Sequence, residues 1–292
     1  MILNLFSKEK NIESELLNRL GAQSFRYTLA RFLYAIKPFS VAPEVRDQVK
    51  VLRRDGMLMI PNFLPSDVFD AYRRDAMKFV ESNPATSSHQ HGCTRVSNYR
   101  LKDQQDGPYH QLYEYFSTEA LRDLMQAAEK RRFCPTEGNM VIEQVSVSAG
   151  KEVDPNTVIH SDVFFKSHKA WLYLDDVDME VGPLAYHPGS QRFTLKRLFS
   201  TYKESIGRNQ ASPRITDDEI ESMNLRESPL CCKANTLVIG DIHGFHRRLS
   251  GSPGSRRHAL HCSYRFNPFV PQILLKILRR RRAPATAQLR NS

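Results

Sequence analysis

A short motif, His160-Ser161-Asp162, followed much later by His246 and Arg257, constrains the fold of this chain more than any other sequence feature. Two imidazoles and one carboxylate can hold a single iron on one face of an octahedron and leave three positions open. A planar guanidinium such as that of Arg257 can bind a carboxylate in a bidentate grip. The pattern therefore predicts a fold that gathers His160, Asp162 and His246 as metal ligands at a catalytic centre, beside an arginine that binds an anion.

Predicted strands flank this motif. Apolar and polar residues alternate over 139–148 as in a half-buried strand, and further strand candidates are 170–175, 235–239 and 258–265. On an extended backbone, residues two apart point to the same face, which a shared metal requires of His160 and Asp162. Arg256 and Arg257 point to opposite faces, so only one of them enters the site. A His-x-Asp pair alone is common by chance, and this context makes it more specific.

Two alternatives concern the second histidine. His243 competes with His246 as a ligand, and its other candidate roles are a contact to a metal ligand, a contact to substrate, or a plain surface position. The stretch Gly240-Asp-Ile-His-Gly244 has the letters of a metallophosphoesterase motif, which binds two metals. That motif needs Asn-His ligand blocks downstream, and the sequence after it holds none. The metallophosphoesterase interpretation is therefore disfavoured.

Helical patterns dominate the start of the chain, and we expect a helical segment over 1–43. Within 24–37, one apolar stripe is formed by Phe25, Leu29, Phe32, Leu33 and Ile36, with Arg26 and Arg31 elsewhere. Further helices are expected at 44–54, 66–81 with Ser66 as N-cap, 117–130 and 216–224. The polar residues 84–110 are expected to form a loop over the site, where substrate contacts are common. Residues 200–230 are expected to be an insertion before the last strands.

Positive charge is concentrated at the C-terminal end, in a predicted basic amphipathic tail over 269–292. The formal net charge is +10, and residues 265–292 hold seven basic residues and no acidic ones. The stretch 273–282 is apolar and then strongly basic, which fits either a solvated tail or an interfacial helix that contacts an anionic membrane through 270–282. No nucleic acid partner is expected, because no aromatic stacking platform adjoins the tail.

The N-terminus lacks the basic region and long apolar core of a signal peptide, and no stretch has the length of a membrane span. The five cysteines, among them Cys93, Cys134 and Cys262, form no disulfide framework and are expected to be reduced. The expected location is therefore cytoplasmic. If the C-terminal tail contacts a membrane, we expect peripheral contact with the inner face of the cytoplasmic membrane.

Four stretches together carry a resemblance to a known family. They are Asp55-Gly-Met-Leu-Met-Ile-Pro-Asn-Phe-Leu64, the motif at 160–162, Asp175-Asp-Val-Asp-Met-Glu-Val-Gly-Pro-Leu184 with His187-Pro-Gly-Ser-Gln-Arg192, and Phe245-His246 with Arg257 and Tyr264. In this order, over about 50–268, the chain resembles the phytanoyl-CoA dioxygenase family of Fe(II)/2-oxoglutarate oxygenases. One departure is that Arg247-Arg248 follow the distal histidine, where the family often has a small hydroxyl residue or glycine.

The resemblance implies an α+β fold with a double-stranded β-helix (jelly-roll) core and flanking helices, here over 44–268. It implies Fe(II), 2-oxoglutarate as cosubstrate and O2. It places Trp171 and Gln144 at the cosubstrate site and assigns the distal carboxylate of 2-oxoglutarate to Arg257. The carboxylate of Asp162 implies hydroxylation, because related halogenases have a small residue in its place.

The expected function is hydroxylation of a C–H bond in a sugar or lipid-linked substrate, with the Kdo sugar of lipopolysaccharide as the leading candidate. Candidate substrate residues are Arg95, Asn98, Arg100 and His243. Two alternatives stay open: a soluble oxygenase that tailors a small metabolite, and an inactive member that binds a membrane or a partner. The oligomeric state is also open.

Overall fold

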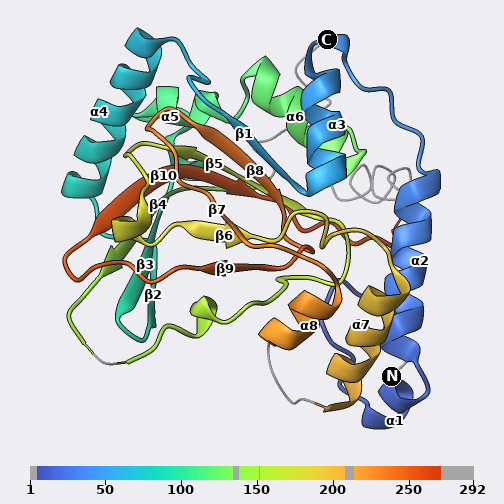
Figure 1. Ribbon diagram of the computed structural model, residues 1–292. Coiled ribbons are helices and arrows are strands. Elements are labelled where there is room, and N and C mark those ends of the chain that lie inside the picture. The colour runs from blue at the N-terminus through green and yellow to red at the C-terminus, as the bar shows by residue number, and fades with distance from the viewer. Residues whose placement is uncertain (1–4, 134–137, 151, 208–213, 271–292) are drawn as a thin grey trace, which may run out of the picture.

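The computed structural model describes residues 5–133, 138–150, 152–207 and 214–270, and its architecture is two antiparallel sheets with helices around them (Figure 1). The large sheet has the strand order β1 (Met57–Ile60), β8 (Leu237–Asp241), β5 (His168–Tyr173), β10 (Arg256–Ser263), β4 (Asn139–Val147), β3 (Thr94–Arg100) and β2 (Ser87–His91). The small sheet has the order β7 (Ser228–Pro229), β6 (Leu184–Tyr186) and β9 (His246–Arg248). This is the expected α+β, jelly-roll architecture.

Alternate residues of the large sheet face two different environments. On β5 and β10, Leu172 pairs with Leu260 and Trp171 pairs with His261. Leu172 and Leu260 pack into the main hydrophobic core, whereas Trp171 belongs to a second cluster on the other face. Because successive side chains of a strand alternate between faces, the register alone decides which residues can enter the space between the two sheets.

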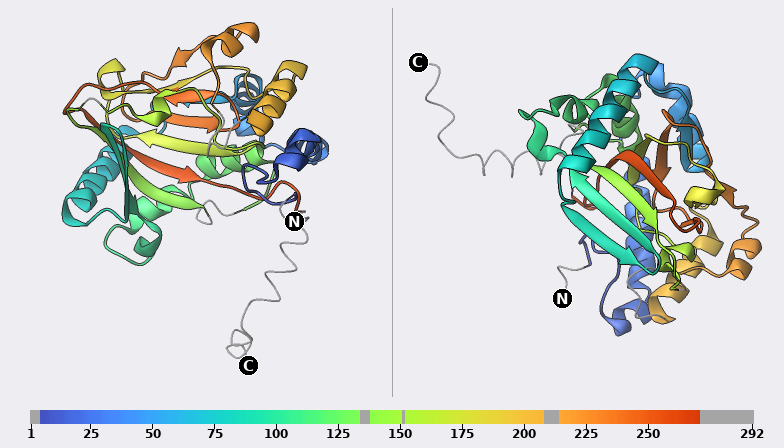
Figure 2. Two further views of the ribbon diagram at one scale, coloured as in Figure 1. Left: turned by 90° about the horizontal axis from the view of Figure 1, so that it is seen from below. Right: turned by 90° about the vertical axis from the view of Figure 1, so that its left-hand side faces the viewer.

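Four helices cover the outer face of the large sheet, opposite the small sheet (Figure 2). They are α3 (Arg46–Asp55), α4 (Ser66–Ser82), α5 (His110–Tyr115) and α6 (Glu119–Glu129). Short 3₁₀ segments are η2 (Pro43–Val45), η3 (Lys102–Gln104), η5 (Pro155–Thr157) and η6 (Met179–Val181). The predicted helix at 66–81 is thus present, but Pro65 is its N-cap and Ser66 is its first residue.

The other helices form a separate layer at one end of the molecule, where α2 packs on both α1 and α7 (Figure 1). They are α1 (Glu15–Arg19), α2 (Ala22–Ile36), α7 (Leu195–Gly207) and α8 (Asp217–Ser222). Thr216 caps α8 through a reciprocal capping box with Glu219, as its sequence position suggests. Among the described helices, none has the length and apolar character needed to cross a bilayer.

The apolar stripe of α2 has an unusual orientation. An amphipathic helix normally turns its apolar side to the core. Here Phe25, Phe32 and Ile36 are 55%, 58% and 59% exposed, whereas Arg26 is completely buried. The predicted helix therefore exists, but its apolar side faces outward.

The expectation of a loop over 84–110 is wrong for part of that range. Residues 87–91 and 94–100 form a hairpin, β2 and β3, at the edge of the large sheet. Strand β2 is almost entirely exposed, so its sequence lacks the apolar alternation that reveals a half-buried strand. The division into segments 1–43, 44–268 and 269–292 stays a prediction, and 271–292 lie outside the described residues.

Candidate metal centre

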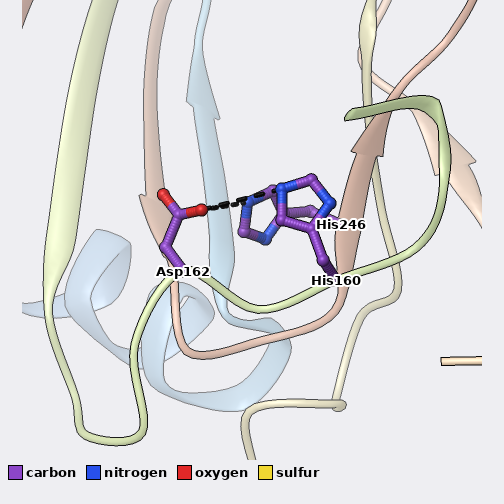
Figure 3. Close-up of side chains that lie close together, drawn as sticks. All are labelled: His160, Asp162 and His246. Carbon is purple, nitrogen blue, oxygen red and sulfur yellow. Dashed lines mark ion pairs between the residues drawn. The ribbon is translucent and has the colours of Figure 1, made fainter. Parts of the chain in front are cut away.

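The structure brings His160, Asp162 and His246 together, although His246 is far from the other two in the sequence (Figure 3). The Nε2 atoms of both histidines lie 3.6 Å from Oδ1 of Asp162. One possible ligand atom of each residue lies within 4.8 Å of the others. Within the described residues, this is the one group of His, Cys, Asp and Glu side chains with that geometry. It offers two nitrogens and one oxygen to a single ion, the set that suits non-haem Fe(II).

Backbone hydrogen bonds hold the three residues in place. His160 and His246 form an antiparallel bridge, in which His160 N donates to His246 O at 2.9 Å and His246 N donates to His160 O at 3.0 Å. The Asp162 N–H donates to Ile242 O at 2.9 Å. The segment around Asp162 is thus not a continuous strand, and these contacts, rather than simple alternation, aim its carboxylate at the histidines.

Both histidines have the tautomer that a metal requires. Nδ1 of His160 lies 2.8 Å from Val158 O, and Nδ1 of His246 lies 2.9 Å from Gly244 O. A carbonyl oxygen can only accept a hydrogen bond, so each Nδ1 carries the hydrogen and each Nε2 is left as the metal-binding atom. Burial and the neighbouring His246 lower the pKa of His160 to about 3, which keeps its imidazole neutral.

Lys169 supports the carboxylate ligand. Its Nζ lies 2.7 Å from Oδ2 of Asp162, the oxygen that does not face the histidines. Burial by itself would raise the pKa of Asp162, but Lys169 and the two histidines outweigh it and hold that pKa well below its usual range. Asp162 is therefore an anion, oriented by one oxygen and available to a metal through the other.

The triad opens onto a pocket of about 190 Å³ between the two sheets. Its other lining residues are Glu143, Asn156, Lys169, Trp171, Tyr173, Leu184, Ile242, Arg248 and Arg257. Arg257 comes from the inner face of β10, whereas its neighbour Arg256 is exposed on the other face. Of the two arginines between which the sequence left a choice, the structure thus brings Arg257 to the site.

Arg257 is a buried cation with few partners. Among the described residues, its guanidinium donates one long hydrogen bond, of 3.3 Å, from Nη2 to Gly182 O, and its buried Nε has no hydrogen-bond partner. A buried charge is costly unless it is paired and hydrogen-bonded. The side chain is therefore suited to a carboxylate ligand such as the distal end of 2-oxoglutarate, which supplies both charge and acceptors.

Trp171 lines the pocket, and its contact with the cosubstrate stays a prediction. Its ring stacks on His261 with centroids 5.3 Å apart. Both ring nitrogens of His261 are buried without a hydrogen-bond partner, and Glu143 is 3.9 Å from its Nδ1. Burial lowers the pKa of His261 to about 4, so this ring is neutral near pH 7. Sequence reasoning overlooked Glu143 and His261.

The structure places Gln144 away from the pocket. Glu143 pairs with Ala259 on the inner face, so its neighbour Gln144 lies on the outer face. There the Gln144 side chain accepts a hydrogen bond of 3.1 Å from the Tyr99 hydroxyl. A strand register one residue away would have brought Gln144 inward, and only the pairing with β10 decides between the two.

The candidate substrate residues are dispersed. Asn98 pairs with Glu143 across β3 and β4 and so shares its inner face, as does Arg100 two residues on, while Arg95 lies on the opposite face. His243 does not line this pocket. It is buried behind the metal ligands, with Nδ1 3.1 Å from Val163 O, which excludes the surface role considered for it.

The Gly240–Gly244 stretch does not build a second metal site in the described part of the chain. Asp241 is buried in an ion pair of 2.7 Å with Lys166, and it joins no cluster of metal-ligating residues. Its carboxylate supports the fold at this turn, where Asp241 Oδ1 also accepts a hydrogen bond from His243 N.

Several lining residues could have been found from alternation. Lys169, Trp171 and Tyr173 line the pocket and are spaced by two on β5, and Arg257 lies on the same face of β10 as Ala259 and His261. Arg248, noted above as a departure from the family pattern, enters the pocket and is paired with Asp154 at 2.7 Å. Its neighbour Arg247 pairs instead with Glu227.

Comparison with known proteins identifies the family. The sequence profile of the Phytanoyl-CoA dioxygenase (PhyH) family matches residues 52–257, which is more than half of the chain. The chain belongs to the phytanoyl-CoA dioxygenase family. It is a non-haem iron dioxygenase that uses Fe and 2-oxoglutarate, as its residue pattern indicates. No curated protein matches the sequence.

Solved structures are similar to this chain at low sequence identity. The epimerase SnoN, in complex with Fe³⁺, alpha ketoglutarate and nogalamycin RO, has a TM-score of 0.52 and 15% identity, covering 76% of this chain and 83% of SnoN. The carbocyclase SnoK has a TM-score of 0.49 and 16% identity, covering 78% and 86%. HygX from Streptomyces hygroscopicus, with nickel, 2-oxoglutarate and hygromycin B, has a TM-score of 0.46 and 12% identity, covering 75% and 86%.

Proposed function

We propose that this family member hydroxylates a C–H bond of an acidic sugar in a lipid-linked substrate, with the Kdo sugar of lipopolysaccharide as the leading candidate. The observation that carries the hydroxylase assignment is the pocket itself. It contains two histidines and an anionic aspartate beside Arg257, a buried cation that forms no ion pair with a carboxylate among the described residues. In this proposal His160, Asp162 and His246 hold Fe(II), and Arg257 holds the distal carboxylate of 2-oxoglutarate.

When bound, iron and 2-oxoglutarate supply the oxidation: one atom of O2 enters succinate as CO2 is released, and the other enters the substrate as a hydroxyl group. The chain's own residues position the reacting groups and shield them from water. Trp171 and Leu184 supply apolar walls, and Lys169 keeps Asp162 ionised and oriented. A closed pocket excludes water and strengthens the charge-assisted contact to Arg257.

The charge of the pocket supports an anionic substrate. The cations Lys169, Arg248 and Arg257, with Arg214 beside His160, face only the carboxylates of Asp162, Glu143 and Asp154. A ferrous ion and a 2-oxoglutarate dianion would cancel each other, so a surplus positive charge would remain. A sugar acid would be attracted to it. Asn98 and Arg100, on the inner face beyond Glu143, are the proposed substrate contacts best supported by the register.

Mass spectrometry of a defined substrate tests this proposal. Kdo-lipid A incubated with enzyme, Fe(II), 2-oxoglutarate and O2 is expected to gain one oxygen atom, with one succinate formed for each hydroxylation. The Kdo assignment is wrong if the lipid keeps its mass under conditions in which the enzyme forms succinate with another substrate.

A cytoplasmic enzyme with peripheral contact to an anionic membrane, through 270–282, is part of this proposal. The residues just before that stretch lie beside the N-terminal segment: Phe269 contacts Phe6 with ring centroids 5.5 Å apart, and Asn267 donates to Phe6 O. Charge supports the assignment, since each basic residue near an anionic surface contributes about 1 kcal/mol.

A soluble oxygenase that tailors a small metabolite is the second candidate, favoured by the similarity to SnoN, whose structure holds nogalamycin RO. Full-length protein with Arg279, Arg280, Arg281 and Arg282 changed to Gln discriminates. Recovery of both wild type and this variant in the soluble fraction favours the soluble enzyme. An inactive binding protein is the third alternative, and an anaerobic titration with Fe(II) and 2-oxoglutarate would exclude it by producing a visible absorption band.

A further inference from the structure

Apolar side chains gather on the helical layer formed by α1, α2 and α7. Most of the large apolar residues that are well exposed in the described structure belong to it or to the segments next to it. They are Phe6, Leu16, Leu20, Phe25, Phe32, Ile36, Phe193, Leu195, Phe199 and Ile206. Exposed apolar side chains are normally scattered, so their concentration on one layer indicates a binding surface.

The spacing of these residues places them along one side of each helix. Phe25, Phe32 and Ile36 recur at the helical repeat on α2, and Leu195, Phe199 and Ile206 recur in the same way on α7. The two helices pack together, and Tyr27 of α2 stacks on Phe193 just before α7 at 5.4 Å. We call the α2 residues Phe25, Leu29, Phe32 and Ile36 the outer stripe.

This outward orientation is built into the fold. The opposite side of α2 is held inward by Arg26, which donates to the side chain of Gln23 and to the backbone carbonyls of Ser7 and Glu9 at 2.8–3.0 Å. Its guanidinium also lies 4.2 Å from the centre of the Phe164 ring. With these contacts made on the inner side, rotation of α2 to bury the outer stripe would break all of them.

A cationic pocket adjoins the outer stripe. It has a volume of about 250 Å³, and five of its lining residues are basic: Arg31, Arg53, Lys130, Lys166 and Arg192. None of its lining residues is acidic. Lys166 is neutralised by Asp241, but Nη1 of Arg31 is buried without a hydrogen-bond partner, and Arg53 is exposed at the rim. Such a pocket suits a group with several anionic oxygens.

Helical geometry places the pocket at the side of the stripe. Ala35 lines the pocket and directly precedes Ile36, and Arg31 directly precedes Phe32. Consecutive residues of a helix are about 100° apart, so the pocket opens next to the stripe and not behind it. One approaching surface can therefore contact the apolar side chains and the cations at once.

We propose that the outer stripe and the cationic pocket together dock the protein on an anionic phospholipid surface, with Phe25, Phe32 and Ile36 in the headgroup boundary and a lipid phosphate in the pocket. Aromatic and apolar side chains beside basic residues are the pattern of interfacial membrane binding. A second copy of this chain would bring two such cationic pockets together, which charge opposes. The inference deepens the proposed function by naming a membrane-docking face distinct from the C-terminal stretch, and it rests on that proposal only for its biological setting.

Vesicle flotation with full-length protein tests the docking face without measuring activity. Wild type is expected to float with vesicles of phosphatidylcholine and phosphatidylglycerol and not with phosphatidylcholine alone. Arg31→Gln/Arg53→Gln should weaken binding about 30-fold, since each arginine near such a surface contributes about a factor of five. Phe25→Ser/Phe32→Ser should weaken it at least about tenfold.

Matched controls remove the same chemistry elsewhere. Arg74→Gln/Lys78→Gln takes two cations from exposed positions on α4, at the other end of the molecule, and Met179→Ser removes an exposed apolar side chain. Both should bind like wild type, and circular dichroism should show every variant folded. Failure of the proposed hydroxylation would leave these results unchanged.

Three outcomes would overturn the inference. The first is equal vesicle binding by the α2 variants and the α4 control. The second is loss of binding only when Arg279, Arg280, Arg281 and Arg282 are changed to Gln, which would make the C-terminal stretch the sole anchor. The third is no vesicle binding by wild type, together with a dimer in sedimentation velocity that Phe25→Ser/Phe32→Ser dissociates, which would make the outer stripe an interface between copies.

Discussion

Arg26 and Arg257 are both buried, but the residues around them form different numbers of hydrogen bonds with the two guanidinium groups. Arg26, under α2, donates three hydrogen bonds of 2.8–3.0 Å to groups of its own chain. Arg257, between the sheets, donates one bond of 3.3 Å and lies against a pocket of about 190 Å³. The Arg26 guanidinium orders the N-terminal segment through its hydrogen bonds, whereas the Arg257 guanidinium remains available to a ligand.

The comparison shows that burial of a charge does not by itself mark a functional residue. Nε is buried without a hydrogen-bond partner among the described residues in both side chains, so the difference lies in how many of the other donors are satisfied and in whether a cavity adjoins the guanidinium. A cation with most of its donors satisfied by its own chain supports the fold, whereas one with few donors satisfied and an adjoining cavity is suited to bind a ligand. Substitutions in the two regions should therefore change different quantities.

His246→Ala should abolish the function of the pocket region while leaving the helical layer intact. Mutation of a residue that only hydrogen-bonds to a metal ligand lowers activity by up to about 100-fold. Loss of one of the three ligands themselves should therefore lower Fe(II)-dependent turnover by more than that. The visible band of the Fe(II)–2-oxoglutarate complex should disappear in an anaerobic spectrum. His89→Ala, at an exposed position on β2, is the control. A normal band in His246→Ala would remove His246 from the ligand set.

Arg26→Met should cost stability and leave 2-oxoglutarate binding unchanged. Three backbone and side-chain acceptors lose a charged donor, so the free energy of unfolding should fall by about 3 kcal/mol. Urea denaturation followed by circular dichroism measures this. The comparison breaks down if the variant is as stable as wild type, because Arg26 would then not be holding the N-terminal segment.

Arg257→Met should show the reverse pattern. Loss of a charge-assisted contact worth about 1.5–3 kcal/mol should raise the Kd of 2-oxoglutarate about 10- to 150-fold. Stability without 2-oxoglutarate should stay the same or rise, because an uncompensated buried charge is removed. Anaerobic titration of the visible band gives the Kd, with Arg256→Met on the same strand as the control. Equal affinities in the two variants would exclude Arg257 as the carboxylate-binding residue.

Arg197 connects the helical layer to the metal centre. From α7, its Nη2 donates to Ser161 Oγ at 2.7 Å and to His243 O at 2.9 Å, next to the metal ligands. Lys10 donates to Ser161 O from the N-terminal segment. Arg197→Met should therefore weaken Fe(II) binding about tenfold, since it removes the hydrogen bond that holds Ser161, the residue between two metal ligands. Competition with a metal-sensitive dye measures this affinity, and Lys203→Met on the exposed side of α7 should match wild type.

Sequence patterns worked best where a local rule and the fold agree. Ser66–Ser82 and Glu119–Glu129 were predictable because helical periodicity is a local property, although Pro65 and not Ser66 is the N-cap of the first. The hairpin at 87–100 was not, because an exposed edge strand has no apolar alternation. Sequence reasoning assigned Gln144 to the cosubstrate site and overlooked Glu143, because only the pairing with β10 shows which face each one occupies.

By itself, the sequence determined the family, the jelly-roll class and the order of the residues that meet at the pocket, because spaced motifs report on chemistry that every member must perform. Only the tertiary structure decided that α2 exposes Phe25, Phe32 and Ile36, that Lys169 supports Asp162, and that Glu143 rather than Gln144 faces the pocket. These outcomes depend on strand register and on which side of a helix is covered. Both are properties of contacts between distant segments, and no local pattern encodes them.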